Sequence, residues 1–475
     1  MVFSNLIFIY VFLPLCLVFY YSARSAKLRN LVLALFSLAF YAWGEPVWVL
    51  LLIFSAAVDY FNGLFIESCR TKKRGKPVLG VVFSLVVNLG ILFAFKYSAF
   101  FIHQLNLLTG LSLHEPTFSL PIGISFYTFQ TISYTVDVYR GKVKAQHSFL
   151  SFLLYVSMFF QLVAGPIVRY ESVAAEIDDR RVTAEDFNSG LVRFVCGLGK
   201  KVIIANTVGQ LAANSLTFEK APTSVAAAWF GVAMFALQIY FDFSGYSDMA
   251  IGLGKMFGFH FPENFNYPYI SRSATEFWRR WHISLGSFFR DYVYIPLGGN
   301  RKHQILNLAI VWFLTGLWHG AAWNFILWGL YYGCFMLFEQ KMGKKRMKKW
   351  PIVWKHVYTK LVIILGFGIF YFEDLGQLGQ FFLNITGISM IANGAPFTDP
   401  MTFSSLRNNI FLILFAILVS LPVLPKIKSY FLESKNDTVY TIGRVGSVAV
   451  CMVLLAVVSV LLVDTTNNVF LYFRF

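Results

Sequence analysis

Long apolar runs separated by short polar connections recur along the whole chain of 475 residues. The runs are continuous, which favours helices over the strands of an outer-membrane barrel, because those strands alternate over about ten residues. A helix needs roughly 17–25 apolar residues to cross a bilayer, and some runs are short enough to be re-entrant, so we expect about 10–13 helices. The predicted spans are approximately 3–21, 30–44, 47–66, 78–99, 119–136, 149–168, 189–213, 225–241, 305–318, 322–340, 356–373, 407–424 and 441–463.

Composition supports membrane embedding. Hydrophobic residues make up 57% of the chain and charged residues 13%, whereas soluble domains carry about 25% charge. No internal repeat, linker or low-complexity tract interrupts the pattern. We therefore expect an all-α polytopic protein with a single membrane domain over residues 1–475.

The net charge of +16 does not indicate a nucleic-acid-binding protein, because the basic residues concentrate in short loops between apolar runs. Such loops are typical of the cytoplasmic side of a membrane. Placing them there puts both the N-terminus and the C-terminus outside. The basic residues behind this orientation are Arg24, Lys27, Arg29, Arg70, Lys72, Lys73, Arg74, Lys76, Lys341, Lys344, Lys345, Arg346, Lys348, Lys349, Lys426, Lys428 and Lys435.

The five cysteines have no paired spacing, and the chain has no zinc or haem pattern. We therefore expect neither a metal nor a bound cofactor.

Residues 265–301 are neither a typical span nor a typical loop. Ser273 is placed to cap a helix, with Glu276 as its capping-box partner three residues later. The predicted helix then mixes tryptophan and phenylalanine with arginine and aspartate up to the Pro-Leu-Gly-Gly-Asn turn at 296–300. Mixed aromatic and basic faces suit a helix at the membrane interface or along a cavity. An interfacial anchor without chemistry is the alternative.

A single histidine, His319, is the only ionisable group in residues 311–330. Ionisable groups at membrane depth are costly and usually face a bundle interior or a water-filled cavity. Gly316 and Gly320 allow a helix or a substrate to approach closely, and Asn324 adds hydrogen-bonding capacity. A neutral imidazole can accept a proton from a hydroxyl and return it to a leaving group. The alternative is a histidine that only hydrogen-bonds another helix. No Gly-x-Ser-x-Gly elbow supports a serine hydrolase.

Several sequence runs make the chain resemble the membrane-bound O-acyltransferase family, in the bacterial branch of alginate and peptidoglycan O-acetyltransferases. The resemblance extends from the first residues to the last. The runs are MVFSN (1–5), YAWGEP (41–46), QLVAGPIVRY (161–170), DFSGYSDMAIG (242–252), FWRRWHISL (277–285), RDYVYIPLGGNR (290–301), TGLWHGAAWNFILWG (315–329) and FLYFRF (470–475).

The resemblance implies a fold, a reaction and a location. In this family a ring of helices surrounds a central funnel, the histidine matching His319 is catalytic, and the one matching His282 is a second functional histidine. An activated acyl group arrives from the cytoplasm and the acceptor lies outside. A secreted or membrane-anchored SGNH-type acetyltransferase often completes transfer to polysaccharide, and a related branch moves D-alanine toward teichoic acid. The implied location is the bacterial inner membrane.

The resemblance thus predicts O-acetylation of an envelope or extracellular polysaccharide, such as alginate or peptidoglycan, from acetyl-coenzyme A or another acetyl thioester. His319 is the expected general base, with His282 orienting the donor or assisting proton transfer. Basic side chains are expected to steer the phosphates of the donor. These are Arg279, Arg280 and Arg290. The signature segments of the resemblance are residues 265–301 and 311–330. Further residues are expected to support the site or to serve as structural hydrogen-bond partners, and for the first three we favour the structural role. These residues are Asp242, Tyr246, Asp248 and Asn324.

The aromatic tail contains Tyr472 between Phe470 and Phe475. Aromatic residues often anchor a chain at the membrane interface. The resemblance adds a second hypothesis, in which the hydroxyl of Tyr472 accepts the acyl group and hands it on.

Three other functions compete with acetyl transfer. Transfer of D-alanine to teichoic acid uses the same chemistry. A transporter or flippase favours paired halves with broken helices at matching positions, and the sequence has none. A membrane scaffold for a secreted enzyme leaves His319 unexplained.

Overall fold

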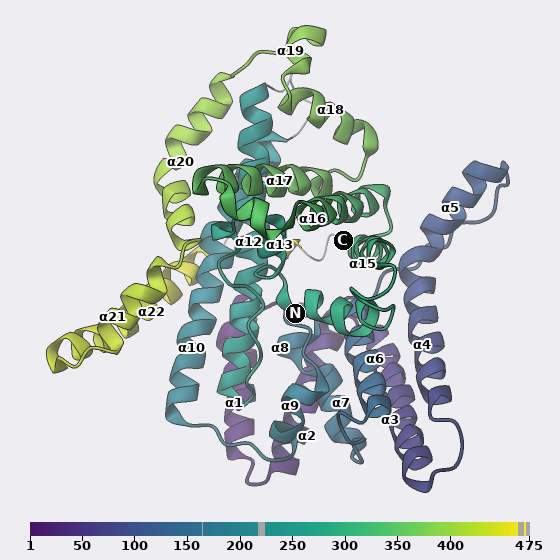
Figure 1. Ribbon diagram of the computed structural model, residues 1–475. Coiled ribbons are helices and arrows are strands. Elements are labelled where there is room, and N and C mark those ends of the chain that lie inside the picture. The colour runs from purple at the N-terminus through teal and green to yellow at the C-terminus, as the bar shows by residue number, and fades with distance from the viewer. Residues whose placement is uncertain (164, 217–223, 464–469, 472–475) are drawn as a thin grey trace. The chain divides into compact units, whose positions relative to one another are not determined.

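The computed structural model describes residues 1–163, 165–216, 224–463 and 470–471, and all of its regular elements in these ranges are helical (Figure 1). The predicted all-α polytopic fold is therefore confirmed. Tyr472 lies outside the described residues.

Six described helices are long and apolar enough to cross a membrane. They are Trp48–Lys72, Val78–Thr109, Val225–Met256, Ile352–Tyr371, Pro400–Val419 and Asp437–Val463. Two shorter apolar helices, Phe8–Ser22 and Gln304–His319, fall where spans are predicted. The chain is thus a multi-pass membrane protein.

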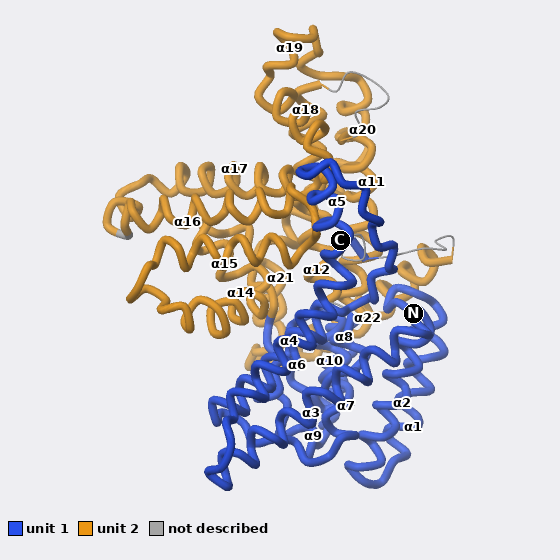
Figure 2. Tube along the Cα trace, turned by 90° about the vertical axis from the view of Figure 1, so that its right-hand side faces the viewer, with its two compact units in different colours: residues 1–194, 247–263, 465–473 blue, residues 195–246, 264–464, 474–475 orange. Residues whose placement is uncertain are grey.

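The residues cluster into two compact units (Figure 2). Unit 1 comprises residues 1–194, 247–263 and 465–473, and unit 2 comprises 195–246, 264–464 and 474–475. The helices α10 and α12 contribute residues to both. A single domain over residues 1–475 stays a prediction.

Unit 1 holds the N-terminal helices. Its elements are η1 (Phe8–Phe12), α1 (Leu13–Ser22), α2 (Ala26–Gly44), α3 (Trp48–Lys72), α4 (Val78–Leu92), η2 (Phe93–Tyr97), α5 (Ser98–Thr109), α6 (Ile124–Arg140), α7 (Phe149–Ser157), α8 (Phe159–Leu162), α9 (Tyr170–Asp178) and most of α10 (Ala184–Gly199).

A polar network joins α3, α4 and α6 inside unit 1. The buried carboxylate of Asp59 accepts hydrogen bonds from Asn88 Nδ2 at 2.7 Å and from Thr135 Oγ1 at 3.1 Å. Lipid tails are as apolar as the helix surfaces, so apolar contacts alone do not select which helices pair inside a membrane. Hydrogen bonds between helices add that selection. These polar side chains therefore specify how the three helices pair.

The predicted span over 149–168 is wrong, because the helix breaks at Met158 into the short helices α7 and α8. The backbone N–H of Phe159 donates to Ser37 Oγ of α2 at 3.2 Å, and Gln161 Nε2 donates to the carbonyl of Tyr155 at 2.5 Å. These side chains bond backbone groups near the break. At 1.5 Å per residue, neither short helix reaches across a hydrocarbon core of about 30 Å.

Unit 2 holds both signature segments. Its elements are η3 (Lys200–Ala205), α11 (Asn206–Ser215), most of α12 (Val225–Met256), η4 (Pro268–Ile270), α13 (Ala274–Trp278), α14 (Ile283–Phe289), η5 (Arg290–Tyr294), α15 (Gln304–His319), α16 (Trp323–Lys349), α17 (Ile352–Tyr371), α18 (Leu375–Ile385), α19 (Ile388–Asn393), α20 (Pro400–Val419), α21 (Val423–Leu432) and α22 (Asp437–Val463).

The helices α15, α16 and α17 run side by side in unit 2 (Figures 1 and 2). Two glycines bring α15 and α16 together. A Cβ at Gly316 would collide with the carbonyl oxygen of Phe325, and one at Gly329 with that of Trp312. The small residues of the sequence therefore produce direct contact between the two helix backbones, as expected.

The loop of unit 1 that follows α12 supplies a pH-dependent contact. His260 Nδ1 lies 2.8 Å from Glu176 Oε1, and its Nε2 lies 3.4 Å from Asp186 Oδ1. The hydrogen bond to Glu176 is the main cause that raises the pKa of His260. Because the folded pKa is raised, the stabilisation is complete below the unfolded pKa of about 6.5 and is lost as pH rises through the folded value.

We therefore expect the melting temperature of the protein to fall as pH rises above about 6.5, and His260→Gln to flatten that dependence. The effect is modest because the side chain is 49% exposed. Thermal melting between pH 6 and pH 9 measures it, with His114→Gln, in an exposed loop of unit 1, as the control. Parallel melting curves for wild type and His260→Gln would contradict the prediction.

Candidate acyl-transfer site

His319 is the last residue of α15. The next residue, Gly320, has extended backbone, and a Cβ there would collide with the ring of Phe325. Glycine, which has no Cβ, avoids this collision and lets the chain leave α15 and turn directly into α16. The imidazole of His319 is thus held at a helix end and remains partly exposed.

Three aromatic rings surround the imidazole of His319. Its centroid lies 4.8 Å from that of Trp318, 4.9 Å from that of Trp328 and 5.2 Å from that of Phe370, and all three contacts are edge-to-face. These rings come from α15, α16 and α17. The aromatic surroundings fix the ring and limit its access to water, which strengthens electrostatic interactions at the site.

Asn324 connects this group of rings to the end of α17. Its fully buried Nδ2 donates to the carbonyl of Phe370 at 3.1 Å and more weakly to that of Ile369 at 3.4 Å. Its Oδ1 is buried without a hydrogen-bond partner among the described residues. Asn324 therefore anchors Phe370, which contacts His319.

His282 lies in unit 2 as well, on the segment between α13 and α14. Its side chain is almost fully buried, and its ring meets Phe243 of α12 edge-on at 4.7 Å. The indole of Trp318 lies 5.9 Å from His282 and is the ring that also contacts His319. The structure thus brings both predicted histidines into contact with the same tryptophan ring.

His282 lies outside the helices that are long enough to span a membrane. Burial lowers the pKa of His282 to about 3. The ring is therefore neutral at physiological pH. A neutral, buried imidazole is suited to hydrogen bonding.

The prediction of a single helix from the cap at Ser273 to the turn at 296–300 is wrong. Ser273 caps α13 as expected, because its Oγ accepts the N–H of Glu276 at 2.9 Å. The Glu276 carboxylate instead accepts the N–H of Arg272 at 3.0 Å. The helix stops at Trp278 because the next turn pairs with the segment before it: Asn266 N–H donates to the carbonyl of Arg280 at 2.9 Å.

Glu339 of α16, which sequence reasoning missed, fixes the start of α13. Its buried carboxylate accepts the N–H of Ala274 at 2.6 Å and the N–H of Thr275 at 2.9 Å. Together with Ser273 it bonds three of the N–H groups that a helix start leaves without partners. An acidic residue inside the predicted apolar span 322–340 was the signal for this role.

We expect Glu339→Gln to destabilise unit 2 by about 1.5–3 kcal/mol, because a charged acceptor of two backbone N–H groups becomes a neutral one with a single acceptor oxygen. Thermal or denaturant unfolding of the purified protein measures the loss. Glu373→Gln makes the same charge change at an exposed position of unit 2 and is the control. Equal melting of the two variants would remove the anchoring role from Glu339.

The three predicted donor-steering arginines differ in their surroundings. Arg280 bonds the Glu276 carboxylate at 3.0 Å, and Arg290 bonds Asp291 at 2.7 Å, so carboxylates balance both charges. Arg279 is exposed, and no described residue forms an ion pair with it. Of these three arginines, Arg279 is thus the one whose charge no described carboxylate balances.

The run 242–252 has residues in both units, and its polar side chains have different partners. Asp242 forms a buried ion pair with Lys201 of η3 in unit 2, with Nζ and Oδ1 2.5 Å apart. Tyr246 is buried in the same unit. Asp248 belongs to unit 1, where it accepts from Arg193 at 2.9 Å. The structural roles favoured for the two aspartates stay predictions, and the buried Lys201 was missed.

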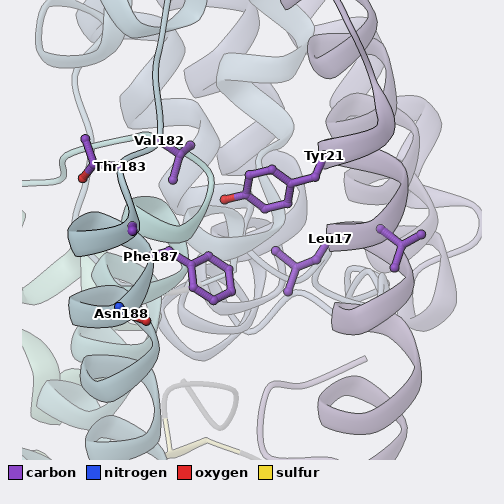
Figure 3. Close-up of a pocket in the computed structure, with 8 residues that line it drawn as sticks. Leu17, Tyr21, Val182, Thr183, Phe187 and Asn188 are labelled. Atoms are coloured by element: carbon purple, nitrogen blue, oxygen red, sulfur yellow. The ribbon is translucent and has the colours of Figure 1, made fainter.

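An open groove of about 480 Å³ lies elsewhere, in unit 1, between α1 and the start of α10 (Figure 3). Leu17, Tyr21 and Phe187 project toward one another across it, and its lining is largely apolar. The Tyr21 hydroxyl donates to the carbonyl of Met256 at 2.7 Å. The lining holds no histidine, cysteine or carboxylate, so this groove lacks a base for acyl transfer.

Comparison with known proteins places this geometry in context. The model of the MBOAT family, the membrane-bound O-acyltransferases, matches residues 6–375, a range that includes both histidines. The probable alginate O-acetylase AlgI of Pseudomonas aeruginosa is 42% identical over 385 residues, covering 79% of this chain and 73% of that protein.

Two further relatives have other acceptors in their names. The peptidoglycan O-acetyltransferase of Helicobacter pylori is 36% identical over 368 residues, covering 70% of this chain and 69% of that protein. The teichoic acid D-alanyltransferase of Bacillus subtilis is 31% identical over 284 residues, covering 54% and 70%. The acetyl-transferring relatives are thus more similar to this chain than the alanyl-transferring one.

Proposed function

The chain belongs to the membrane-bound O-acyltransferase family, and we propose that it transfers acetyl groups to hydroxyl groups of an envelope or extracellular polysaccharide. The observation that carries the proposal is the pair of histidines that both contact the ring of Trp318 in unit 2. The greater similarity to the O-acetylating relatives favours acetate over D-alanine as the transferred group.

The proposed donor is acetyl-coenzyme A or another acetyl thioester that reaches the site from the cytoplasm. His319 removes the proton from the acceptor hydroxyl as its oxygen attacks the thioester carbonyl. The new C–O ester bond forms, the C–S bond breaks, and His319 returns the proton to the departing thiolate. His282 stays neutral and hydrogen-bonds the substrate, and Arg279 attracts the donor phosphates.

The location and partners follow from the same proposal. We place the protein in the bacterial inner membrane with both termini outside, because the basic loops then face the cytoplasm. An SGNH-type acetyltransferase outside the membrane would pass the acetyl group to alginate, peptidoglycan or a related polysaccharide.

The proposal is tested by incubating the purified protein with radiolabelled acetyl-coenzyme A and oligosaccharides from alginate or peptidoglycan, with and without an SGNH-type protein. We expect label in a base-labile O-acetyl ester. Label that never leaves the thioester under any of these conditions would contradict the proposal. Transfer of D-alanine from a carrier thioester, with none of acetate, would support the alternative.

Tyr472→Phe tests the proposed relay through the tail. The variant keeps the aromatic ring and removes the hydroxyl, so we expect transfer to polysaccharide to fall about 10²-fold or more if the tyrosine is a covalent carrier. Membrane content of the protein should stay constant, and Phe473→Leu is the control for the ring. Unchanged acetylation in Tyr472→Phe would leave the tail only an interfacial anchor.

A further inference from the structure

His282 adopts a left-handed backbone conformation with φ of 45°. A residue with a Cβ rarely does so, and a costly conformation persists only where its surroundings fix it. The adjacent N–H of Ile283 donates to the backbone carbonyl of Asn264 at 2.9 Å. The turn that carries His282 is thus held by the segment that precedes η4.

The side chain of Asn264 has an orientation that its neighbours determine. Its Oδ1 accepts the backbone N–H of Ser284 at 3.2 Å and the hydroxyl of Ser284 at 2.8 Å. A backbone N–H can only donate, so the atom facing it must be the amide oxygen rather than the amide nitrogen. The amide of Asn264 is therefore assigned without reference to the histidine.

The same oxygen lies 3.3 Å from Nδ1 of His282. Because Asn264 Oδ1 is an acceptor, Nδ1 must carry the hydrogen. The hydroxyl of Ser284 is 3.5 Å from Nδ1 but already donates to the amide oxygen. A neutral imidazole carries one N–H, so Nε2 is left with a lone pair.

That nitrogen is buried and has no hydrogen-bond partner among the described residues. The whole residue is only 3% exposed. A buried acceptor without a donor is energetically costly, so such atoms call for an explanation. A substrate group that donates a hydrogen to Nε2 would remove this cost while bound.

We propose that Asn264 is a positioning residue that holds His282 as the Nδ1–H tautomer, so that Nε2 accepts a hydrogen bond from an O–H or N–H group of the substrate. The proposal rests on the proposed acyl transfer. Two sources offer this chemistry: the acceptor hydroxyl and the amide N–H of a pantetheine-type thioester. The metal-ligating histidines of enzymes are oriented by partners in the same way.

The tautomer is measured directly by solid-state NMR of the full-length protein labelled with ¹⁵N-histidine, using His282→Asn to identify the His282 signals. We expect a protonated Nδ1 and an unprotonated Nε2 in wild type. Asn264→Leu should shift the ring toward the Nε2–H form that free histidine favours in water, and Asn264→Asp should keep Nδ1–H. A wild-type ring with hydrogen on Nε2, or an unchanged ring in Asn264→Leu, would overturn the proposal.

Kinetics distinguish the two sources. We expect Asn264→Leu to lower kcat/KM about tenfold, mainly by raising the KM of the substrate that donates to Nε2, while Asn264→Asp retains most of the activity. Asn266→Leu makes the matched change at an exposed position two residues away. A rise in the KM of the thioester assigns the amide, and a rise in the KM of the oligosaccharide assigns the hydroxyl. Equal effects of the two leucine variants, or a change in neither KM, would overturn the subsite.

These outcomes are separable from failure of the proposed function. If wild type transfers no acetyl group, the NMR spectra still show which nitrogen of His282 carries the hydrogen. If Asn264→Leu does not fold, the wild-type and Asn264→Asp spectra decide the tautomer.

Discussion

Replacing His319 with alanine is expected to lower acetyl transfer by about 10²- to 10⁴-fold, the range that a general base contributes, without unfolding the protein. The side chain ends α15, is partly exposed and meets the neighbouring aromatic rings edge-on. Its loss should therefore leave the pairing of α15 and α16 intact, since this pairing depends on Gly316 and Gly329.

The kinetic pattern distinguishes a base from a structural residue. If His319 acts only in the transition state, kcat and kcat/KM should fall together while KM for the donor changes little. His319→Asn, which keeps a polar side chain of smaller size, should be as inactive as His319→Ala, because an amide cannot accept the proton.

Initial rates with labelled acetyl thioester and a fixed oligosaccharide measure these changes, and thermal melting reports folding. His114→Ala, in an exposed loop of unit 1, is the matched control. Wild-type rates in either His319 variant would remove the base from the mechanism. A melting temperature far below that of the control would assign His319 a structural role.

The sequence predicted the helical class and the membrane location because both depend on long-range composition and run length. The roles of the two histidines stay predictions, drawn from recognisable runs and from a polar group among apolar residues. The contact of both histidines with Trp318 was not foreseen, because ring contacts depend on how α13 and α15 pack, which periodicity does not encode.

The errors at Met158 and His282 share one physical cause. Both positions lie in runs that read as continuous helix, yet side chains and backbone from distant segments bond the local N–H and carbonyl groups: Ser37 at the first break and Asn264 at the second. Helix propensity is a weak preference that such tertiary bonds override. Glu339 and Lys201 were also missed, although each is an ionisable residue inside a predicted span and could have been recognised by that.

The Lys201–Asp242 pair should give the largest change in stability. The two side chains are each only 5% exposed, and α12 meets the backbone of η3 beside them, where a Cβ at Gly245 would lie 3.3 Å from the N atom of Lys201. Little room exists for water to replace either partner. Removing one partner should therefore leave an uncompensated buried charge.

We expect Lys201→Met to destabilise the protein by about 3–5 kcal/mol, because Asp242 is left buried without its cation. Asp242→Leu should be similarly harmful, because Lys201 is then left buried without its carboxylate. The double variant Lys201→Met with Asp242→Leu should recover most of the loss, since apolar side chains of similar volume often replace a buried ion pair at little cost. The four proteins form a double-mutant cycle with a strongly favourable coupling energy.

Unfolding in detergent micelles, followed by tryptophan fluorescence or thermal melting, measures the cycle, and Lys435→Met at an exposed site of unit 2 is the control. The activity of the double variant then separates two roles for Asp242. If the pair only fastens α12 to η3, the double variant should transfer acetyl groups at nearly the wild-type rate once folded, because Phe243 still contacts His282. A stable but inactive double variant would instead place the charge of Asp242 or Lys201 in the chemistry, and single variants as stable as the control would show that the pair is not buried as described.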